Sequence, residues 1–235
     1  MSSYTRRQLK EDKFAETASE AVHWASGHRK GMVIGVAAGL AVVLLGVGAY
    51  FWWSHQTEQA NVALSKAIRT FTAPLRPAGT PPNESMQTFT SIAERGTQAE
   101  KEFKAVADGY SMTQPGKVAS YMAGAAALQA GNNADAEKQL KAAAASGGRD
   151  IAALSNFALA GLYRSTNRQA DAARIYKDLS DQPTNTVSKA QAQLAMAEMY
   201  EASDPKQADG IYEQVKKENA DNAAGQIAAA KLAKK

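Results

Sequence analysis

The chain has 235 residues, of which 45% are hydrophobic and 7% aromatic, and it carries a formal net charge of +4 with no cysteine. This length allows one solenoid or one to two compact domains, and the missing cysteine rules out disulfides and thiol catalysis. Because no block of dense Lys and Arg is interleaved with aromatic residues, we do not expect nucleic-acid binding.

Residues 1–30 predict a short amphipathic tail. Apolar residues recur there at spacings of three and four, which places them on one side of a helix. They are Leu9, Phe14, Ala18, Ala21, Val22 and Ala25. Two interpretations stay open: a helix lying along the inner membrane leaflet, and a docking helix for a membrane partner. The first part of this tail, TRRQLKEDKF, has no role that the sequence assigns.

Residues 31–53 predict a transmembrane helix. The stretch contains no charged side chain, and at about 1.5 Å per residue it covers roughly 30–35 Å, the thickness of a bilayer's hydrocarbon layer. A cleaved export signal would be shorter and would end in small residues, whereas this stretch ends in Tyr50, Phe51, Trp52 and Trp53. We therefore expect a permanent anchor.

The flanking charges predict its orientation. Six basic residues precede the span: Arg6, Arg7, Lys10, Lys13, Arg29 and Lys30. The nearest basic residues after it are Lys66 and Arg69. Because Lys and Arg near a span tend to stay in the cytoplasm, the N-terminus is expected to be cytoplasmic. In a bacterial inner membrane, the C-terminal part would then lie in the periplasm.

Glycines form a stripe along the predicted span. Gly31, Gly35 and Gly39 are four residues apart, and Gly46 returns to the same face two turns later. Small residues let helices approach closely in lipid. The stripe predicts a helix-packing face, either for a homodimer or for a partner's helix.

Residues 54–115 predict a stalk helix, a proline-rich loop and a second helix. The helical pattern of the span continues to Phe71, and APLRPAGTPPNES then interrupts it. The next helical stretch carries Ala99 and Phe103 on one face and ends near Tyr110. We expect this stretch to be a divergent first repeat.

Residues 116–219 contain an internal repeat with an offset of 36 residues. Three sets of residues superpose, each of one size class: Ala136, Ala172 and Ala208; Leu140, Tyr176 and Tyr212; Ala143, Leu179 and Val215. Small and large residues at these spacings suit closely crossing helices, so the fold class predicted is all-α, with one membrane helix followed by a solenoid. Residues 220–235 predict a helix that caps the solenoid, with Ile227, Ala230 and Leu232 on one side and the solvated Lys231, Lys234 and Lys235 on the other. The alternative is a basic targeting tail.

These residues resemble the tetratricopeptide repeat, a helix–turn–helix unit of about 34 residues. Gly124 and Ala160 match its small first-helix position, and Tyr163 matches its first-helix aromatic. The chain departs from the pattern at Met196, which the constant offset places at a small position, and in its displaced or missing closing proline.

With the anchor, the architecture resembles the YfgM-like family of membrane-anchored tetratricopeptide proteins. The stretch ERGTQAEKEFKAVADGYSMTQPGKVASYMAGAAALQAGNNADAEKQL is similar to that family's first repeats. The resemblance implies an ancillary protein beside the Sec translocon that passes exported polypeptides to periplasmic folding factors. The alternative is a structural subunit of a stable membrane complex.

Catalytic chemistry is not expected. His23, His28 and His55 all flank the span, so they suit neither a metal site nor a catalytic triad in the repeat region, and no cofactor is predicted. Carried over from one repeat to the next, the pattern instead predicts a peptide-binding groove. Its residues are Tyr121, Phe157 and Gln193 at one position and Leu128, Arg164 and Tyr200 at another. The alternative is that the aromatic residues pack between repeats.

Overall fold

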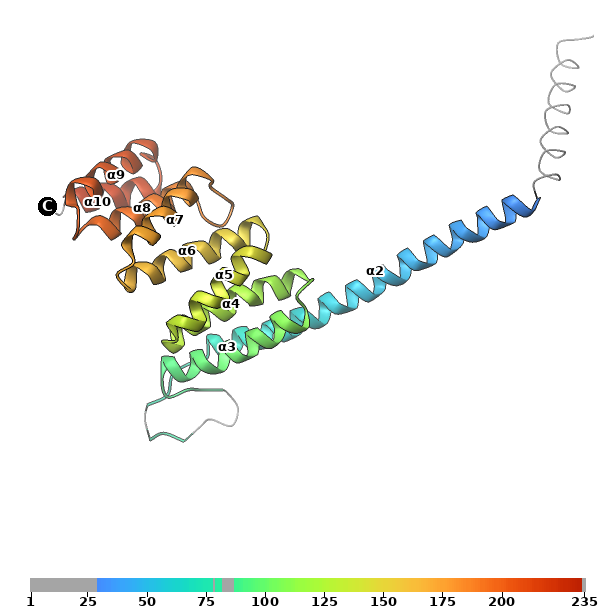
Figure 1. Ribbon diagram of the computed structural model, residues 1–235. Coiled ribbons are helices and arrows are strands. Elements are labelled where there is room, and N and C mark those ends of the chain that lie inside the picture. The colour runs from blue at the N-terminus through green and yellow to red at the C-terminus, as the bar shows by residue number, and fades with distance from the viewer. Residues whose placement is uncertain (1–28, 78, 82–86, 234–235) are drawn as a thin grey trace, which may run out of the picture. The chain divides into compact units, whose positions relative to one another are not determined.

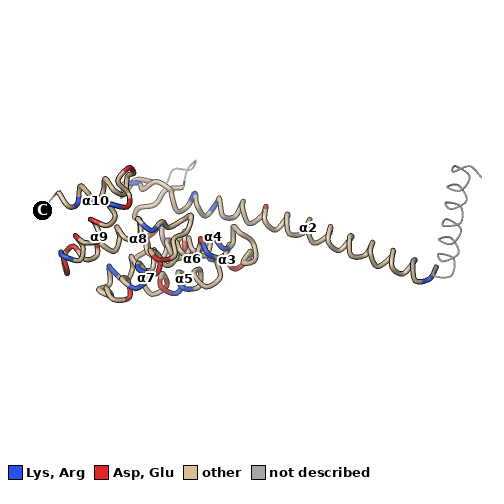
Figure 2. Tube along the Cα trace, turned by 90° about the horizontal axis from the view of Figure 1, so that it is seen from above, with Lys and Arg blue, Asp and Glu red and all other residues tan. Residues whose placement is uncertain are grey.

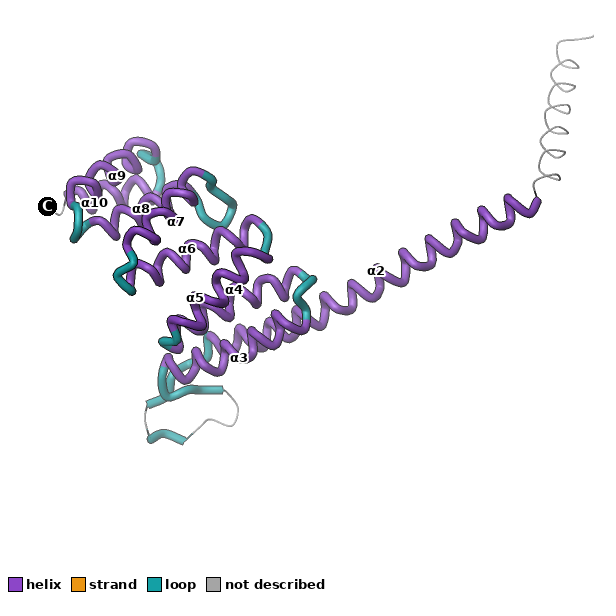
Figure 3. The backbone as a smooth tube through the Cα atoms, in the orientation of Figure 1, coloured by secondary structure: helices purple, strands orange, loops and turns teal. Residues whose placement is uncertain are grey.

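The computed structural model describes residues 29–77, 79–81 and 87–233. Over these residues the protein is all-helical, and the one β-type contact is an isolated bridge between Leu75 and Phe89 (Figures 1 and 3). The helices are α2 (Arg29–Phe71), α3 (Ile92–Gly109), α4 (Gln114–Ala130), α5 (Asn133–Ser146), α6 (Arg149–Ser165), α7 (Gln169–Asp181), α8 (Lys189–Tyr200), α9 (Pro205–Glu218) and α10 (Ala223–Ala233). The residues that predict the amphipathic tail lie outside the described part.

The chain divides into two compact units, residues 1–55 and 56–235. In the first unit, α2 exposes its large apolar side chains: Leu45 is 74% exposed, and Leu44 is 70% exposed. Figure 2 shows charged residues at the beginning of α2, where Arg29 and Lys30 lie, and none along the rest of this part of the helix. Among the described residues, α2 is the one helix long and apolar enough to cross a membrane. The predicted apolar helix is therefore present, and water is a poor solvent for its surface.

In the second unit, each helix from α3 to α10 packs mainly against the next one in the chain. The turns follow from local sequence signals. Thr113 caps α4 by accepting a hydrogen bond from the Gly116 backbone N–H, and Pro115 occupies the first turn, where no N–H is needed. Gly131 ends α4 with a φ of 78°, which glycine adopts without strain, and Asn132 then caps α5.

The core of this unit combines small residues with a few large ones. Ala136, Leu140 and Tyr176 are almost completely buried in the central cluster. Gly124 of α4 shows why small residues recur: a Cβ there would lie 2.7 Å from Leu140 Cδ2 on α5. A larger residue at this position would force Leu140 to shift, so the close crossing of α4 and α5 favours glycine there.

The last part of α2, from Gln56 onward, belongs to this core. Ala60 and Ala67 are fully buried, and the Phe71 ring meets the Phe103 ring of α3 edge to face at 5.8 Å. The sequence predicted a stalk here. The helix does continue, but its alanines bury a face against the cluster that α3 and α4 form.

The C-terminal helix α10 differs from the predicted arrangement of its faces. Ala228 and Gly225 are buried, whereas Ile227 is 46% exposed. Lys231 was predicted on the solvent side, but its Nζ lies 3.0 Å from Glu201 Oε1 at the end of α8. The side of α10 that packs against the domain is formed by Ala224, Gly225, Ala228 and Leu232, which leaves Ile227 outward.

Candidate interaction surfaces

Four of the six predicted groove residues pack against the central hydrophobic cluster. They are Tyr121, Leu128, Phe157 and Tyr200, each partly buried. The Phe157 ring meets the Tyr176 ring of α7 edge to face at 5.6 Å. Burial also raises the pKa of the Tyr121 hydroxyl. These contacts are those of side chains that pack between helices.

Arg164 lies in a chain of charges that joins α6, α8 and α10. Its Nη1 is 3.6 Å from Glu198 Oε2, and Lys231 Nζ is 3.6 Å from Glu198 Oε1. Lys231 also contacts Glu201, which accepts a 2.8 Å hydrogen bond from the Tyr212 hydroxyl. Burial, with this carboxylate, raises the pKa of Tyr212. Arg164 therefore already has an acidic partner within the protein.

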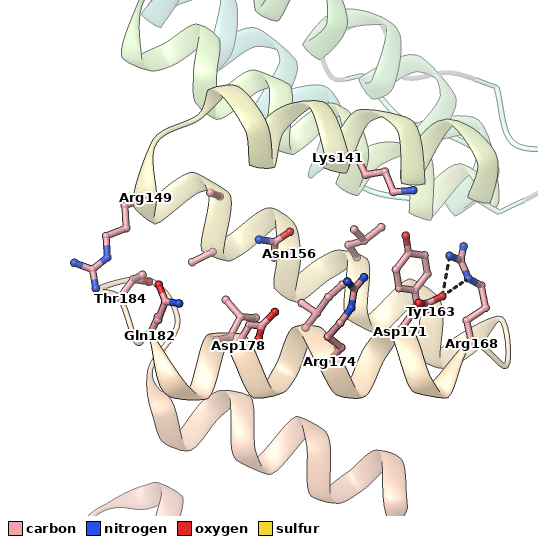
Figure 4. A pocket seen from close by; sticks show the side chains of 15 residues that line it. Lys141, Arg149, Asn156, Tyr163, Arg168, Asp171, Arg174, Asp178, Gln182 and Thr184 are labelled. Carbon is pink, nitrogen blue, oxygen red and sulfur yellow. Dashed lines mark hydrogen bonds and ion pairs between the residues drawn. The ribbon is translucent and has the colours of Figure 1, made fainter.

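A first hollow of about 690 Å³ lies between α5 and α7, with α6 as its floor (Figure 4). None of the six predicted groove residues lines it. Figure 4 shows Asn156 on the middle helix, with Lys141 on one side and Arg174 and Asp178 on the other. Leu159, Tyr163 and Ile175 supply further lining.

A second hollow of about 600 Å³ lies between α7 and α9, with α8 as its floor. Two predicted groove residues, Gln193 and Tyr200, line it together with Met196 and Ile211. The structure thus brings these two together in a hollow and leaves Tyr121, Leu128, Phe157 and Arg164 outside both hollows.

The two hollows place α8 in a different register from the one that the constant offset gives. Ala160 and Ala197 are both fully buried, and Tyr163 and Tyr200, three residues later, both line a hollow. Ala197, not Met196, therefore corresponds to Ala160. The predicted alignment of Gln193 with Phe157 is wrong by one residue, and Gln193 corresponds to Asn156. The reason is that Ala197 and Ala208 are one residue closer in sequence than the corresponding Ala160 and Ala172, because α8 ends earlier than α6 does.

Glu137 of α5 organises one end of the first hollow. It accepts hydrogen bonds from Lys141 Nζ at 2.6 Å, from the Tyr163 hydroxyl at 2.9 Å and from Arg168 Nη1 at 2.9 Å. The Lys141 hydrogen bond, followed by that of Tyr163, lowers the pKa of Glu137 from 4.5 to about 2. Arg168 also lies over the Tyr163 ring, 3.8 Å from its centroid, and pairs with Asp171. This network fixes α5, α6 and α7 to one another.

Arg174 of α7 lines both hollows. It makes no ion pair with any residue of the described part, unlike Lys141 with Glu137 and Lys177 with Asp181. The sequence pattern gave no reason to single it out, because a charged residue on an amphipathic helix usually faces solvent alone. The repeated lysine, Lys141 and Lys177, was the available signal that this side of the helices is also periodic.

The predicted glycine face is open in the single chain. A Cβ added at Gly31, Gly35, Gly39 or Gly46 would meet nothing within 4 Å. Within the ranges that the structure describes, no three His, Cys, Asp or Glu side chains are arranged to hold a metal ion. No family model, no curated protein and no solved structure matches this chain.

Proposed function

We propose that this protein is a membrane-anchored protein-interaction module. The observation that carries the proposal is that the two parts of one helix, α2, suit different environments. Its first part exposes large apolar side chains, and its last part buries alanines in the core of a hairpin domain. Such a helix tethers the domain to a bilayer and so raises the concentration of the domain near other membrane-bound chains.

The helical hairpins from α3 to α10 support a tetratricopeptide-like solenoid as the interacting part. They pack consecutively, and their buried residues include Ala136, Ala172 and Ala208, which define the repeat. Solenoids of this kind offer long surfaces to extended or helical segments of other proteins. The domain lies in the periplasm in this proposal, because the basic residues precede the span.

The resemblance to YfgM-like proteins makes exported polypeptides at the translocon the first class of partner proposed. The second candidate, a fixed subunit of a membrane complex, is favoured by the glycine face, which has open space along its length. In lipid such a face suits a second helix, from a partner or from another copy of this chain.

Extraction of the full chain from its own membrane in a mild detergent, followed by mass spectrometry, tests both roles. Many substoichiometric polypeptides indicate a chaperone-like role, and one fixed set in constant ratio indicates a subunit. Recovery of the chain without any polypeptide, under conditions that keep a known membrane complex intact, would contradict the interaction module itself.

A further inference from the structure

The two hollows carry similar side chains at most equivalent positions, except that Asp171 and Asp178 of the first hollow correspond to Gln207 and Gln214 of the second. The first hollow contributes the first residue of each pair and the second hollow the other: Lys141 and Lys177, Asn156 and Gln193, Leu159 and Met196, Tyr163 and Tyr200, Asp171 and Gln207, Ile175 and Ile211, Asp178 and Gln214. Each hollow therefore has a side-chain amide and a tyrosine on its floor, an aliphatic side chain from each of two helices, and a lysine at its edge.

One floor amide, that of Gln193, has a buried atom without a hydrogen-bond partner within the described ranges. Gln193 is only 4% exposed, and its Oε1 is buried without a donor. Asn156 is half-buried and lines the first hollow, and its amide is not among the buried polar groups that lack a partner. A buried amide oxygen without a hydrogen bond destabilises the fold, so Gln193 beside the second hollow indicates a ligand that completes it, and Asn156 offers an amide at the equivalent position of the first hollow.

A side-chain amide carries one acceptor and two donors, which is the complement of a peptide group. An extended segment can offer its backbone N–H and C=O to such amides, whereas an α-helix uses these groups internally. The amides thus favour an extended ligand over a helical one. The aliphatic pairs Leu159 with Ile175 and Met196 with Ile211 suit apolar side chains of the same segment.

The guanidinium of Arg174 indicates that the ligand carries negative charge. It lies on α7 between the hollows and is exposed, and it is not ion-paired to the described part of the chain. The lysines at the edges are already held by acidic residues of their own helices. A guanidinium in this position is a donor for a carboxylate of the bound segment.

We propose that the two hollows form one docking surface on which an extended, acidic polypeptide segment crosses α7. Its backbone pairs with the amides of Asn156 and Gln193, its apolar side chains enter the hollows, and its carboxylate meets Arg174. The inference rests on the proposed interaction function and names the surface and the chemistry of its partner.

The test uses the full chain in detergent micelles and two fluorescein-labelled peptides. One peptide alternates leucine with aspartate, and its twin has lysine for aspartate. Fluorescence anisotropy should show that the wild-type chain binds the acidic peptide at least about tenfold more tightly than the basic one. Equal affinity for the two peptides, or no binding of the acidic one, would overturn the proposal.

Two variants with matched controls locate the site. Arg174→Glu should weaken acidic-peptide binding about tenfold and move the preference toward the basic peptide, while Lys138→Glu, the same charge change on the exposed side of α5, should not. Gln193→Leu should weaken binding of the acidic peptide several-fold while unfolding at the same or a higher urea concentration, because it removes an unpaired buried amide. Gln191→Leu, on the exposed side of the same helix, should leave binding unchanged.

The outcome is separable from that of the proposed function. If the acidic peptide binds and both Arg174→Glu and Gln193→Leu bind it like the wild type, the docking surface lies elsewhere, although the protein remains an interaction module. The recovery of polypeptides from the native membrane, described above, does not depend on either peptide.

Discussion

Two parts of the molecule use the same secondary structure for opposite solvents. In residues 31–53, large apolar side chains are outward and glycines share one face. In the hairpins from α3 to α10, alanines and a few large residues are inward, and the charged side chains other than Glu100 are mostly outward. The difference teaches that helix formation itself says little here, and that the direction of the apolar side chains decides which environment stabilises each part.

The largest expected effect comes from placing charge in the outward apolar stretch. Val43→Arg combined with Leu44→Arg should oppose membrane insertion by about 5–7 kcal/mol, because each central arginine costs about 2.5–3.5 kcal/mol. Both side chains are exposed in α2. Alkaline carbonate extraction of membranes should then release the variant chain into the supernatant.

The control is Val62→Arg. Val62 is 69% exposed and lies in the second unit, so this variant should stay in the membrane pellet. If the double variant also stays in the pellet, residues 31–53 are not the anchor, and the contrast between the two parts has another cause.

The second-largest effect comes from comparing the same substitution, leucine to alanine, at two positions. Leu140→Ala in the core should destabilise the hairpin domain by about 2–5 kcal/mol, because Leu140 is fully buried and contacts α4 at Gly124. Leu45→Ala, at a residue that is 74% exposed, should leave that domain unchanged. Urea unfolding of the full chain in detergent, followed by circular dichroism, measures both.

A similar loss of domain stability in the two variants would remove the distinction between an inward and an outward leucine. An unchanged urea midpoint for Leu140→Ala would mean that the cluster formed by α4, α5, α6, α7 and α8 does not stabilise the domain.

The sequence predicted the secondary structure of both the apolar helix and the hairpins. The apolar helix was predictable because 23 residues without charge have few alternatives in water. The alternation of helices was predictable because small residues recur near 36 residues and turns carry Gly, Asn, Asp and Pro. Both signals depend on side-chain size and polarity alone.

The register of α8 and the two hollows were beyond such signals. The stretch from one helix to the next can lose one residue without changing the periodicity within either helix. The constant offset therefore placed Met196 where Ala197 lies. Polar residues such as Asn156 and Arg174 look like a solvated face until the neighbouring helices are placed around them. For the same reason the pattern gave Arg164 a ligand-binding role, although Glu198 already pairs with it.

The smallest expected effect concerns the charges of the inward-packed part. Glu137 is 27% exposed, and its folded-state pKa of about 2 lies below the ordinary value of 4.5. A carboxylate with a lowered pKa adds stability that is fully present above about pH 4.5 and is lost as the pH falls toward 2. Glu137→Gln should therefore cost about 1 kcal/mol at neutral pH, since partial exposure weakens its ion pairs, and the difference from wild type should shrink steadily below pH 4.5.

Urea midpoints of wild type and Glu137→Gln across this pH range measure the effect. Glu213→Gln serves as the control, because Glu213 is 61% exposed and has one long ion pair, at 3.6 Å, to Lys216. A gap between wild type and Glu137→Gln that stays constant down to pH 2 would mean that Glu137 acts through side-chain shape and neutral hydrogen bonds. That result would sharpen the contrast between the two parts of the molecule. Packing of inward side chains alone would stabilise the hairpins in water, whereas outward apolar side chains stabilise the anchor in lipid.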